Sequence, residues 1–185
     1  MTGEAFPIFS KVPYDEVAAK VVLSAKESAL ASAKALLVDA LTETTSEFLK
    51  CFNIMDGRVE LVPIPSSRRV RMRRGGDFMY ELAKATQSRL TEVAPLLDIR
   101  VTKLLHVNKT IMDQSRLSEH ERDLNLKGAF RADSNHQSTS YLLIVDDVIT
   151  TGSTLREAYR ALKERNMTVL GAVTACASQR RLLIR

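Results

Sequence analysis

Residues 142–154 read Leu-Leu-Ile-Val-Asp-Asp-Val-Ile-Thr-Thr-Gly-Ser-Thr, and this stretch says more about the fold than any other. Its four aliphatic residues, Leu142 to Val145, predict a buried strand, because a strand covered on both faces loses the polar alternation of a half-exposed one. The strand runs into Asp146 and Asp147, and a short hydroxyl-rich turn follows. The amphipathic stretch 155–165 then predicts a helix.

The turn consists of small residues that suit a bound phosphate: Thr150, Thr151, Gly152, Ser153 and Thr154. At the start of a helix the unpaired backbone N–H groups and the positive end of the helix dipole favour an anion. The threonine and serine hydroxyls supply further donors. The strand, turn and helix start therefore predict a phosphate-binding cradle.

The acid pair needs a separate explanation, because carboxylates repel phosphate. Asp146 and Asp147 suit a ligand that carries hydroxyls or Mg²⁺ a few ångströms from its phosphate, as a ribose 5-phosphate does. Taken alone, the pair is explained by a response-regulator-like acidic pocket, or by a solvated strand end with a helix cap, as well as by such a ligand. The hydroxyl-rich turn at this spacing favours the phosphorylated sugar.

The whole segment closely resembles the thirteen-residue phosphoribosyl-pyrophosphate (PRPP) motif of type I phosphoribosyltransferases. The resemblance implies that Asp146 and Asp147 are catalytic residues that hold the ribose 2- and 3-hydroxyls. It also implies that residues 150–154 bind the 5-phosphate. Mg²⁺ is the expected cofactor, held directly or through water by the same two acids.

Further segments resemble the ComF family of competence-associated, phosphoribosyltransferase-like proteins. They are Leu61-Val-Pro-Ile-Pro65, Arg74-Gly75, Gln114, Leu117 to Arg122, Asn125 and Gly128-Ala129-Phe130, so the likeness covers roughly residues 58–176. Two departures are clear. The family's Arg-Gly-Phe-Asn-Gln is Arg74-Gly75-Gly76-Asp77-Phe78 here, and its amino-terminal four-cysteine zinc module is missing.

The remaining pattern alternates strands with helices, which predicts an α/β fold with a mostly parallel twisted sheet flanked by helices, as in type I phosphoribosyltransferases. Ligands of such sheets bind at the carboxyl ends of the strands. We expect one domain over residues 1–185. Its predicted parts are an irregular lead-in at 1–13, two helices within 14–50, strands at 58–64, 99–107, 129–132 and 167–175, and a helix at 77–94.

Five arginines lie between Pro63 and Arg74, with no acid among them. In the type I family a short loop after the first core strand holds the pyrophosphate, and Ser67, Arg68 and Arg69 occupy that position here. Arginine offers a forked, permanently charged donor set for phosphate oxygens. A solvated basic loop or a nucleic-acid patch is the alternative, and the position after a proline-bounded strand favours pyrophosphate.

Residues 108–128 are polar, balanced in charge and without a clear period. They occupy the place where the family has a flexible loop that closes over its substrate, and a lid of this kind excludes water from the reaction. Arg116 and Arg122 are candidate ligand contacts from this lid. Pairing of the two arginines with neighbouring acids explains them equally well.

The bulk composition narrows the class of protein. The chain has 185 residues, a formal net charge of +5 and two cysteines, which is too few for a disulfide framework or a zinc quartet. Three single histidines without ligand-spaced partners make a histidine-based metal site improbable. We expect a cytoplasmic protein without a secretion signal or a membrane span. The oligomeric state, a homodimer included, stays open.

The leading hypothesis is a PRPP-dependent phosphoribosyltransferase that uses Mg²⁺ and an unidentified acceptor. The second is a non-catalytic module that binds PRPP or another nucleotide containing ribose 5-phosphate and serves DNA uptake or regulation. The third is a nucleic-acid-binding protein that uses the arginine-rich segment, which we do not favour.

Overall fold

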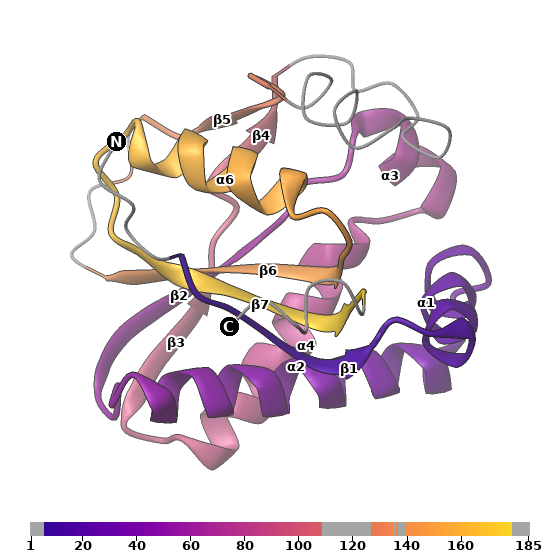
Figure 1. Cartoon of the computed structure of the whole chain (residues 1–185), viewed down its shortest axis with the longest axis horizontal. Helices are drawn as coiled ribbons and strands as arrows, with labels where there is room; N and C mark the ends of the chain where they lie inside the picture. Colours follow the sequence, from indigo (N-terminus) through magenta and orange to yellow (C-terminus); the bar gives the residue numbers. More distant parts are fainter. Residues whose placement is uncertain (1–5, 109–126, 135, 137–139, 179–185) are drawn as a thin grey trace.

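The computed structural model describes residues 6–108, 127–134, 136 and 140–178. Its centre is a five-stranded sheet with the order β1-β7-β6-β2-β3, in which every neighbouring pair is parallel (Figure 1). The strands are β1 (Ile8–Pro13), β2 (Gly57–Pro63), β3 (Leu97–Val101), β6 (Tyr141–Ile149) and β7 (Val169–Ala177). The predicted α/β fold class is confirmed.

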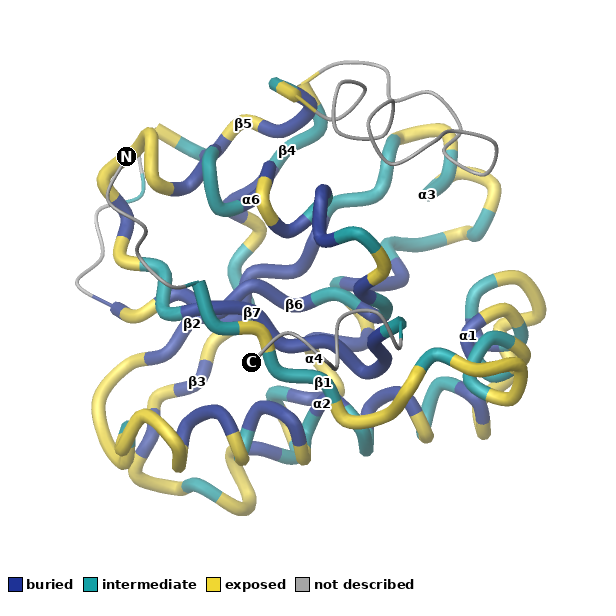
Figure 2. Tube along the Cα trace, viewed as in Figure 1, coloured by how far each residue is buried: buried dark blue, intermediate teal, exposed yellow. Residues whose placement is uncertain are grey.

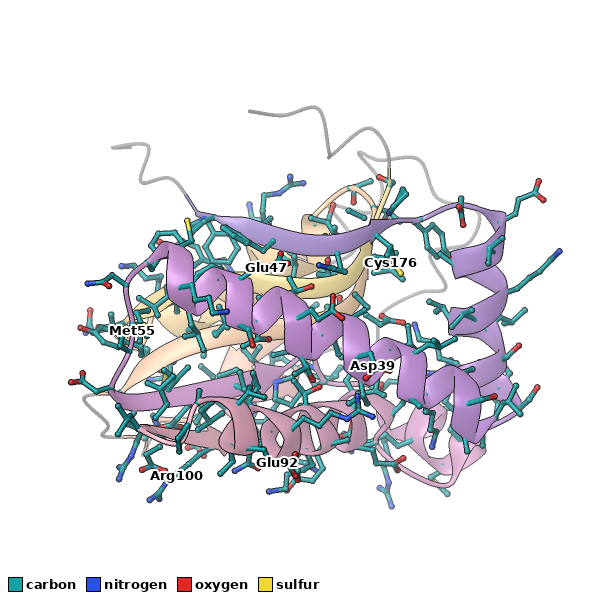
Figure 3. The ribbon with its side chains drawn as sticks, turned by 90° about the horizontal axis from the view of Figure 1, so that it is seen from below. Asp39, Glu47, Met55, Glu92, Arg100 and Cys176 are labelled. Carbon is teal, nitrogen blue, oxygen red and sulfur yellow. The ribbon has the colours of Figure 1, made fainter. Side chains whose placement is uncertain are left out.

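Helices cover both faces of this sheet. They are α1 (Glu16–Glu27), α2 (Ala31–Cys51), α3 (Arg68–Arg74), α4 (Phe78–Val93) and α6 (Ser153–Lys163). In Figure 1, α2 and α4 lie below the sheet and α6 lies above it. Seen from below, α2 and α4 lie side by side, and an ion pair between Asp39 and Arg89 links them (Figure 3).

The two faces carry two separate hydrophobic cores, because successive strand residues point to opposite sides. Leu143 and Val145 of β6 belong to the core beneath α1, α2 and α4, whereas Leu142 and Ile144 belong to the core beneath α6. The central strands are buried and the outer sides of the helices are exposed, as Figure 2 shows. In the described part of the chain, no helix has the length and apolar character needed to cross a bilayer.

The amino-terminal segment, residues 1–13, was predicted to be irregular, and this was wrong for residues 8–13. They form β1, which pairs with β7 from Ile8 opposite Ala172 to Pro13 opposite Ala177. Phe9 anchors the strand by packing edge-on against Phe48, with 5.1 Å between the ring centroids. Proline is tolerated at the end of an edge strand, so Pro13 did not rule the strand out.

The strand predicted over 99–107 is two strands in two different sheets. β3 ends at Val101, and the backbone N–H of Thr102 donates to the carbonyl of Leu61 at 3.0 Å. The chain then crosses into β4 (Leu105–Val107), which pairs antiparallel with β5 (Phe130–Ala132). We call this two-stranded ribbon the hood; Figure 1 shows it beside α6, above the main sheet.

The arginine-rich segment was expected to be a loop, but residues 68–74 form the short helix α3. The hydroxyl of Ser67 caps it by accepting from the backbone N–H of Val70 at 3.3 Å. Gly75 ends it in the left-handed conformation, with φ of 72°. The consequence is that the arginines point in different directions around a helix and do not form one continuous basic loop.

Candidate functional site

The carboxyl ends of β2, β6 and β7 lie at one edge of the sheet, because these strands are parallel and in register. Pro63 of β2 lies opposite Val145 of β6, and Asp146 lies opposite Thr174 of β7. The pairing continues past β2, where the backbone N–H of Ile64 donates to the carbonyl of Val145 at 3.0 Å. The segment that leads to α3 and the acid pair with its turn therefore leave the sheet at the same edge.

The motif strand was expected to end at Asp146 and Asp147, but it does not. β6 continues to Ile149 and keeps its pairing with β7 through Val148 opposite Cys176. Strand alternation therefore gives the two acids different environments. Asp147 shares the face of Leu143 and Val145, towards α1, and Asp146 shares the opposite face, towards α6.

Asp147 is 4% exposed and forms an ion pair with Lys26 of α1. No cation beside the acid pair could be expected from the sequence, because Lys26 lies some 120 residues earlier in the chain. Lys26 also lies 5.8 Å from the ring centroid of Phe78, so its charge sits between an acid and an aromatic face. The acid pair thus has a positive partner within the protein itself.

Asp146 is half-buried, and its Oδ1 accepts from the backbone N–H of Asp147 at 2.9 Å. Burial raises the pKa of the Asp146 carboxyl well above the ordinary value of 3.8. The negative charge of Asp147 raises this pKa further, and Lys26 only partly opposes the increase. A neighbouring cation or a ligand hydroxyl would relieve this cost, so Asp146 is the acid better prepared for a ligand.

The predicted cradle has the geometry of a tight turn into a helix. Gly152 adopts the left-handed conformation with φ of 79° and ψ of 3°, and α6 begins at Ser153. The hydroxyls of Thr151 and Ser153 are hydrogen-bonded at 2.7 Å. Thr150 is exposed, whereas Thr154 is half-buried in the first turn of the helix. The five predicted residues therefore run from the end of β6 into the first turn of α6.

Sequence reasoning missed Arg156, which adds a positive charge to this turn. One guanidinium nitrogen donates to the carbonyl of Thr151 at 3.4 Å, and the other donates to the hydroxyl of Ser153 at 3.3 Å. Its position in the first turn of the amphipathic helix was the available signal. The guanidinium reinforces the helix dipole, since both attract a bound anion.

A cleft of about 860 Å³ opens between α3 and the hood. One wall comes from the end of β2 and the start of α3 and includes Ser67, Arg68 and Arg69, the three residues predicted to bind pyrophosphate. Arg71 also lines this wall and donates to the carbonyl of Ser66 at 3.0 Å. Among the described residues that line the cleft there is no member of the acid pair or of the turn at 150–154.

Two of the five arginines are directed away from the cleft. Arg74 donates to Glu27 of α1 at 2.6 Å, and Arg73 reaches the same carboxylate at 3.3 Å. The Arg74 hydrogen bond, with the charge of both arginines, lowers the pKa of Glu27. These two arginines hold α3 against α1. The positive charge of the segment therefore serves partly to hold the helix in place and partly to line the cleft.

The opposite wall belongs to the hood and to the chain that leads into it. It contributes Lys103, His106, Asn108 and Arg131 to the cleft, together with Leu105 and Val107. Sequence reasoning placed Val107 at a ligand-binding strand end but assigned none of the four polar residues to a site. Their proximity depends on β4 pairing with β5 across more than twenty residues of intervening chain, and no local motif marks it.

Mg²⁺ is a hard cation that prefers oxygen ligands and often keeps several waters while bound by one or two carboxylates and substrate phosphates. The described residues include no cluster of three or more histidine, cysteine, aspartate or glutamate side chains that could hold a metal ion. Asp147 is paired with Lys26, which leaves Asp146 as the available carboxylate. This donor set fits a cation that arrives with a phosphorylated ligand. It does not fit a permanent protein cage.

The candidate lid contacts Arg116 and Arg122 lie outside the residues that the structure describes.

Comparison with protein-family models matches residues 74–183 to the phosphoribosyl transferase domain. The chain belongs to this family. The match includes the acid pair, the turn at 150–154 and the hood. A comparison with curated protein sequences finds no significant match.

Solved phosphoribosyltransferase structures are similar to the chain at low identity. Adenine phosphoribosyltransferase from Saccharomyces cerevisiae, in complex with an imino-altritol bisphosphate and adenine, is 14% identical with a TM-score of 0.45, over 82% of this chain and 72% of that one. A hypoxanthine phosphoribosyltransferase from Staphylococcus aureus is 16% identical with a TM-score of 0.42, over 80% of this chain and 66% of that one.

Proposed function

We propose that this phosphoribosyl transferase domain binds PRPP with Mg²⁺ and transfers the phosphoribosyl group to an acceptor nucleophile, which displaces pyrophosphate from C1 of the ribose. The observation that carries the proposal is the convergence of two anion-binding features at one edge of the sheet. Gly152 heads α6 at the end of β6, and the Arg68–Arg69 pair begins α3 at the end of β2. PRPP carries a phosphate at C5 and a pyrophosphate at C1, and it would span these two features.

The roles of the residues follow from their charge and position. The backbone N–H groups after Gly152, the hydroxyls of Thr151 and Ser153, and Arg156 would hold the 5-phosphate. Asp146 would accept hydrogen bonds from the ribose hydroxyls. Arg68 and Arg69 would bind the pyrophosphate and stabilise the negative charge that develops on it as it leaves.

Mg²⁺ would neutralise the pyrophosphate when bound. Breaking the C1–O bond places positive charge on the ribose ring and negative charge on the leaving group. The protein's part is therefore to orient the ribose and to stabilise both charges. Asp146 and Asp147 supply negative charge on the ribose side, and the arginines supply positive charge on the pyrophosphate side.

A second candidate function is a non-catalytic PRPP- or nucleotide-binding module. The pairing of Asp147 with Lys26 favours it, because an acid that is neutralised by the protein contributes less to a positively charged ribose. The resemblance of residues 58–176 to the ComF family is compatible with such a module in DNA uptake or regulation. Binding of PRPP is common to both candidates, and turnover separates them.

Two measurements test the proposal. Isothermal titration with PRPP, with and without Mg²⁺, should give saturable binding that requires the cation. A pyrophosphate-release assay over a panel of nucleobases and other nitrogen nucleophiles should then identify an acceptor. Binding without release for any acceptor would support the non-catalytic module, and absence of PRPP binding would contradict both candidates.

A further inference from the structure

The hood wall of the cleft carries positive charge that the proposed PRPP contacts do not use. Lys103 and Arg131 line this wall, with His106 and Asn108 beside them. Among the described residues that line the cleft, one is acidic, Asp77, and the cations are Arg68, Arg69, Arg71, Lys103 and Arg131. The proposed pyrophosphate contacts lie on the α3 wall, so the cations of the hood wall have no ligand assigned to them.

Strand register brings two of these residues together. His106 of β4 lies directly opposite Arg131 of β5 in the antiparallel ribbon. Directly opposed residues project to the same side of such a ribbon. The other side of the hood carries Leu105, Phe130 and Ala132, which are buried in the core beneath α6. His106 and Arg131 therefore face away from that core and into the cleft.

The side chain of Arg131 is available to a ligand. It is exposed, and no hydrogen bond or ion pair is formed by it within the described part of the chain. Lys103 differs, because its ammonium lies 3.7 Å from a carboxylate oxygen of Asp77 and 3.9 Å from the ring centroid of Tyr80. Asp77 thus offsets the charge of Lys103, whereas no described acid offsets the charge of Arg131.

The described lining offers no flat platform for a neutral base. It includes no phenylalanine, tyrosine or tryptophan, and its apolar part comes from aliphatic residues such as Ile64, Leu105 and Val107. Stacking of a base on an aromatic ring normally supplies a large share of the affinity for an uncharged heterocycle. An anionic group held by a guanidinium supplies affinity without an aromatic ring.

We infer that the acceptor is a small nitrogen compound that carries a carboxylate or another anionic group, and that Arg131, with His106 beside it, binds this group. The inference rests on the proposed function, since it places the acceptor in the cleft next to C1 of the ribose. Arg131 is then a specificity-determining residue. The anion would be fixed by the hood while the nitrogen faces the ribose.

The test compares acceptor probes that differ only in charge. The pairs are uracil-6-carboxylate with uracil and pyridine-3-carboxylate with pyridine-3-carboxamide. They are titrated into protein that holds ribose 5-phosphate and Mg²⁺-pyrophosphate, which fill the proposed PRPP site and do not undergo transfer. We expect at least one carboxylate to bind about tenfold or more tightly than its neutral partner, as a charge-assisted hydrogen bond predicts.

Arg131→Gln should reduce this preference to less than about threefold while the affinity for PRPP alone stays unchanged. The matched control is Arg165→Gln, which removes the same charge from an exposed position beyond α6 and should leave the preference intact. Neutral probes that bind as well as the carboxylates, no binding of either carboxylate, or an unchanged preference in Arg131→Gln would each overturn the inference. Failure of PRPP itself to bind the unaltered protein would instead contradict the proposed function.

Discussion

Lys26, near the end of α1, forms an ion pair with the buried carboxylate of Asp147 in the motif strand β6. The pair joins an amino-terminal helix to the strand that carries the candidate site. The side chains of Lys26 and Asp147 are 25% and 6% exposed, so the acid is largely removed from water and the lysine is not. Removing either partner therefore has different consequences from removing Asp146.

Asp147→Asn and Lys26→Met should each destabilise the protein, since each leaves one charge of the pair without its partner. Breaking a fully buried pair costs about 3–5 kcal/mol, and partial exposure of Lys26 reduces this to about 1–3 kcal/mol. Urea denaturation at pH 7 measures the difference. Lys11→Met is the control, because Lys11 pairs with Glu43 and Glu47 at the surface and should matter little. Equal effects of Lys26→Met and Lys11→Met would contradict the structural role of the Lys26 pair.

Replacing Asp146 should have the opposite effect on stability from replacing Asp147, and the size of the effect should depend on pH. Its folded-state pKa is raised, so folding favours the protonated form, and its contribution to stability falls as pH rises from about 4 through the raised pKa. Asp146→Asn removes this pH-dependent contribution to the free energy of unfolding. The variant should gain stability relative to the parent as pH increases over that window, and should lose affinity for PRPP. A stability difference that does not change with pH would mean that the carboxyl of Asp146 is not perturbed.

Gly152→Ala should weaken both stability and PRPP binding. A residue with a β-carbon pays about 1–2 kcal/mol in the left-handed conformation that Gly152 adopts. The shift of the turn should also disturb the N–H groups that face the phosphate. Gly57→Ala is the control. Gly57 is also left-handed, with φ of 89°, a β-carbon there would meet no atom within 4 Å, and it lies at the opposite end of β2.

Both glycine variants should therefore lose stability in thermal or urea denaturation, and only Gly152→Ala should lose PRPP affinity in titration. If the two variants bound PRPP equally well, the phosphate would have to bind elsewhere.

Arg68→Ala combined with Arg69→Ala should reduce PRPP affinity by about ten- to a hundredfold, the value of one or two charge-assisted hydrogen bonds. Arg73→Ala should not, because Arg73 pairs with Glu27 away from the cleft. All variants are titrated with PRPP and with random duplex DNA at two salt concentrations, since phosphate contacts to DNA are steeply salt-dependent. Loss of DNA binding with intact PRPP affinity would favour the nucleic-acid hypothesis.

The two cysteines should differ sharply in reactivity. Cys51 is exposed, whereas Cys176 is buried in β7. Burial, together with the negative charges of Asp147 and Asp15, raises the pKa of the Cys176 thiol to about 11. A thiol-alkylating reagent at pH 7.5, followed by mass spectrometry, should label Cys51 in the native protein and Cys176 only after denaturation, because the thiolate is the reactive form. Rapid labelling of both would indicate that the β1–β7 edge opens in solution.

The sequence predicted those parts of the fold that local pattern determines. The aliphatic run before Asp146, the glycine turn and the amphipathic helix after it all lie where they were expected, as do the two amino-terminal helices. Three of the failures share one physical cause. β1, the break between β3 and β4, and the hood wall with Arg131 depend on partners that lie far away along the chain.

The same reason explains the candidate site. Thr151, Gly152 and Ser153 could be named as candidates because a turn of this type is contiguous in the sequence. Lys26 could not be assigned, since its ion pair with Asp147 appears only after folding. Arg156 was missed although it lies in the first turn of the amphipathic helix, directly after the hydroxyl-rich turn. The helix at 68–74 was missed because its five arginines were interpreted as a charged loop and the segment has no apolar period. Ser67 and Gly75, at its two ends, are ordinary capping residues.

The pairing of β1 with β7 has a consequence for how the molecule reaches its native state. Ile8 lies opposite Ala172, so the strand of the sheet that comes first along the chain pairs with the one that comes last. Contacts between such distant parts of a chain slow folding, because a long loop must close before they form. The sheet cannot be completed during synthesis until residues 169–177 have left the ribosome. Until then β1 lacks the strand with which it pairs, and an unpaired strand edge of this kind makes a folding chain prone to aggregation.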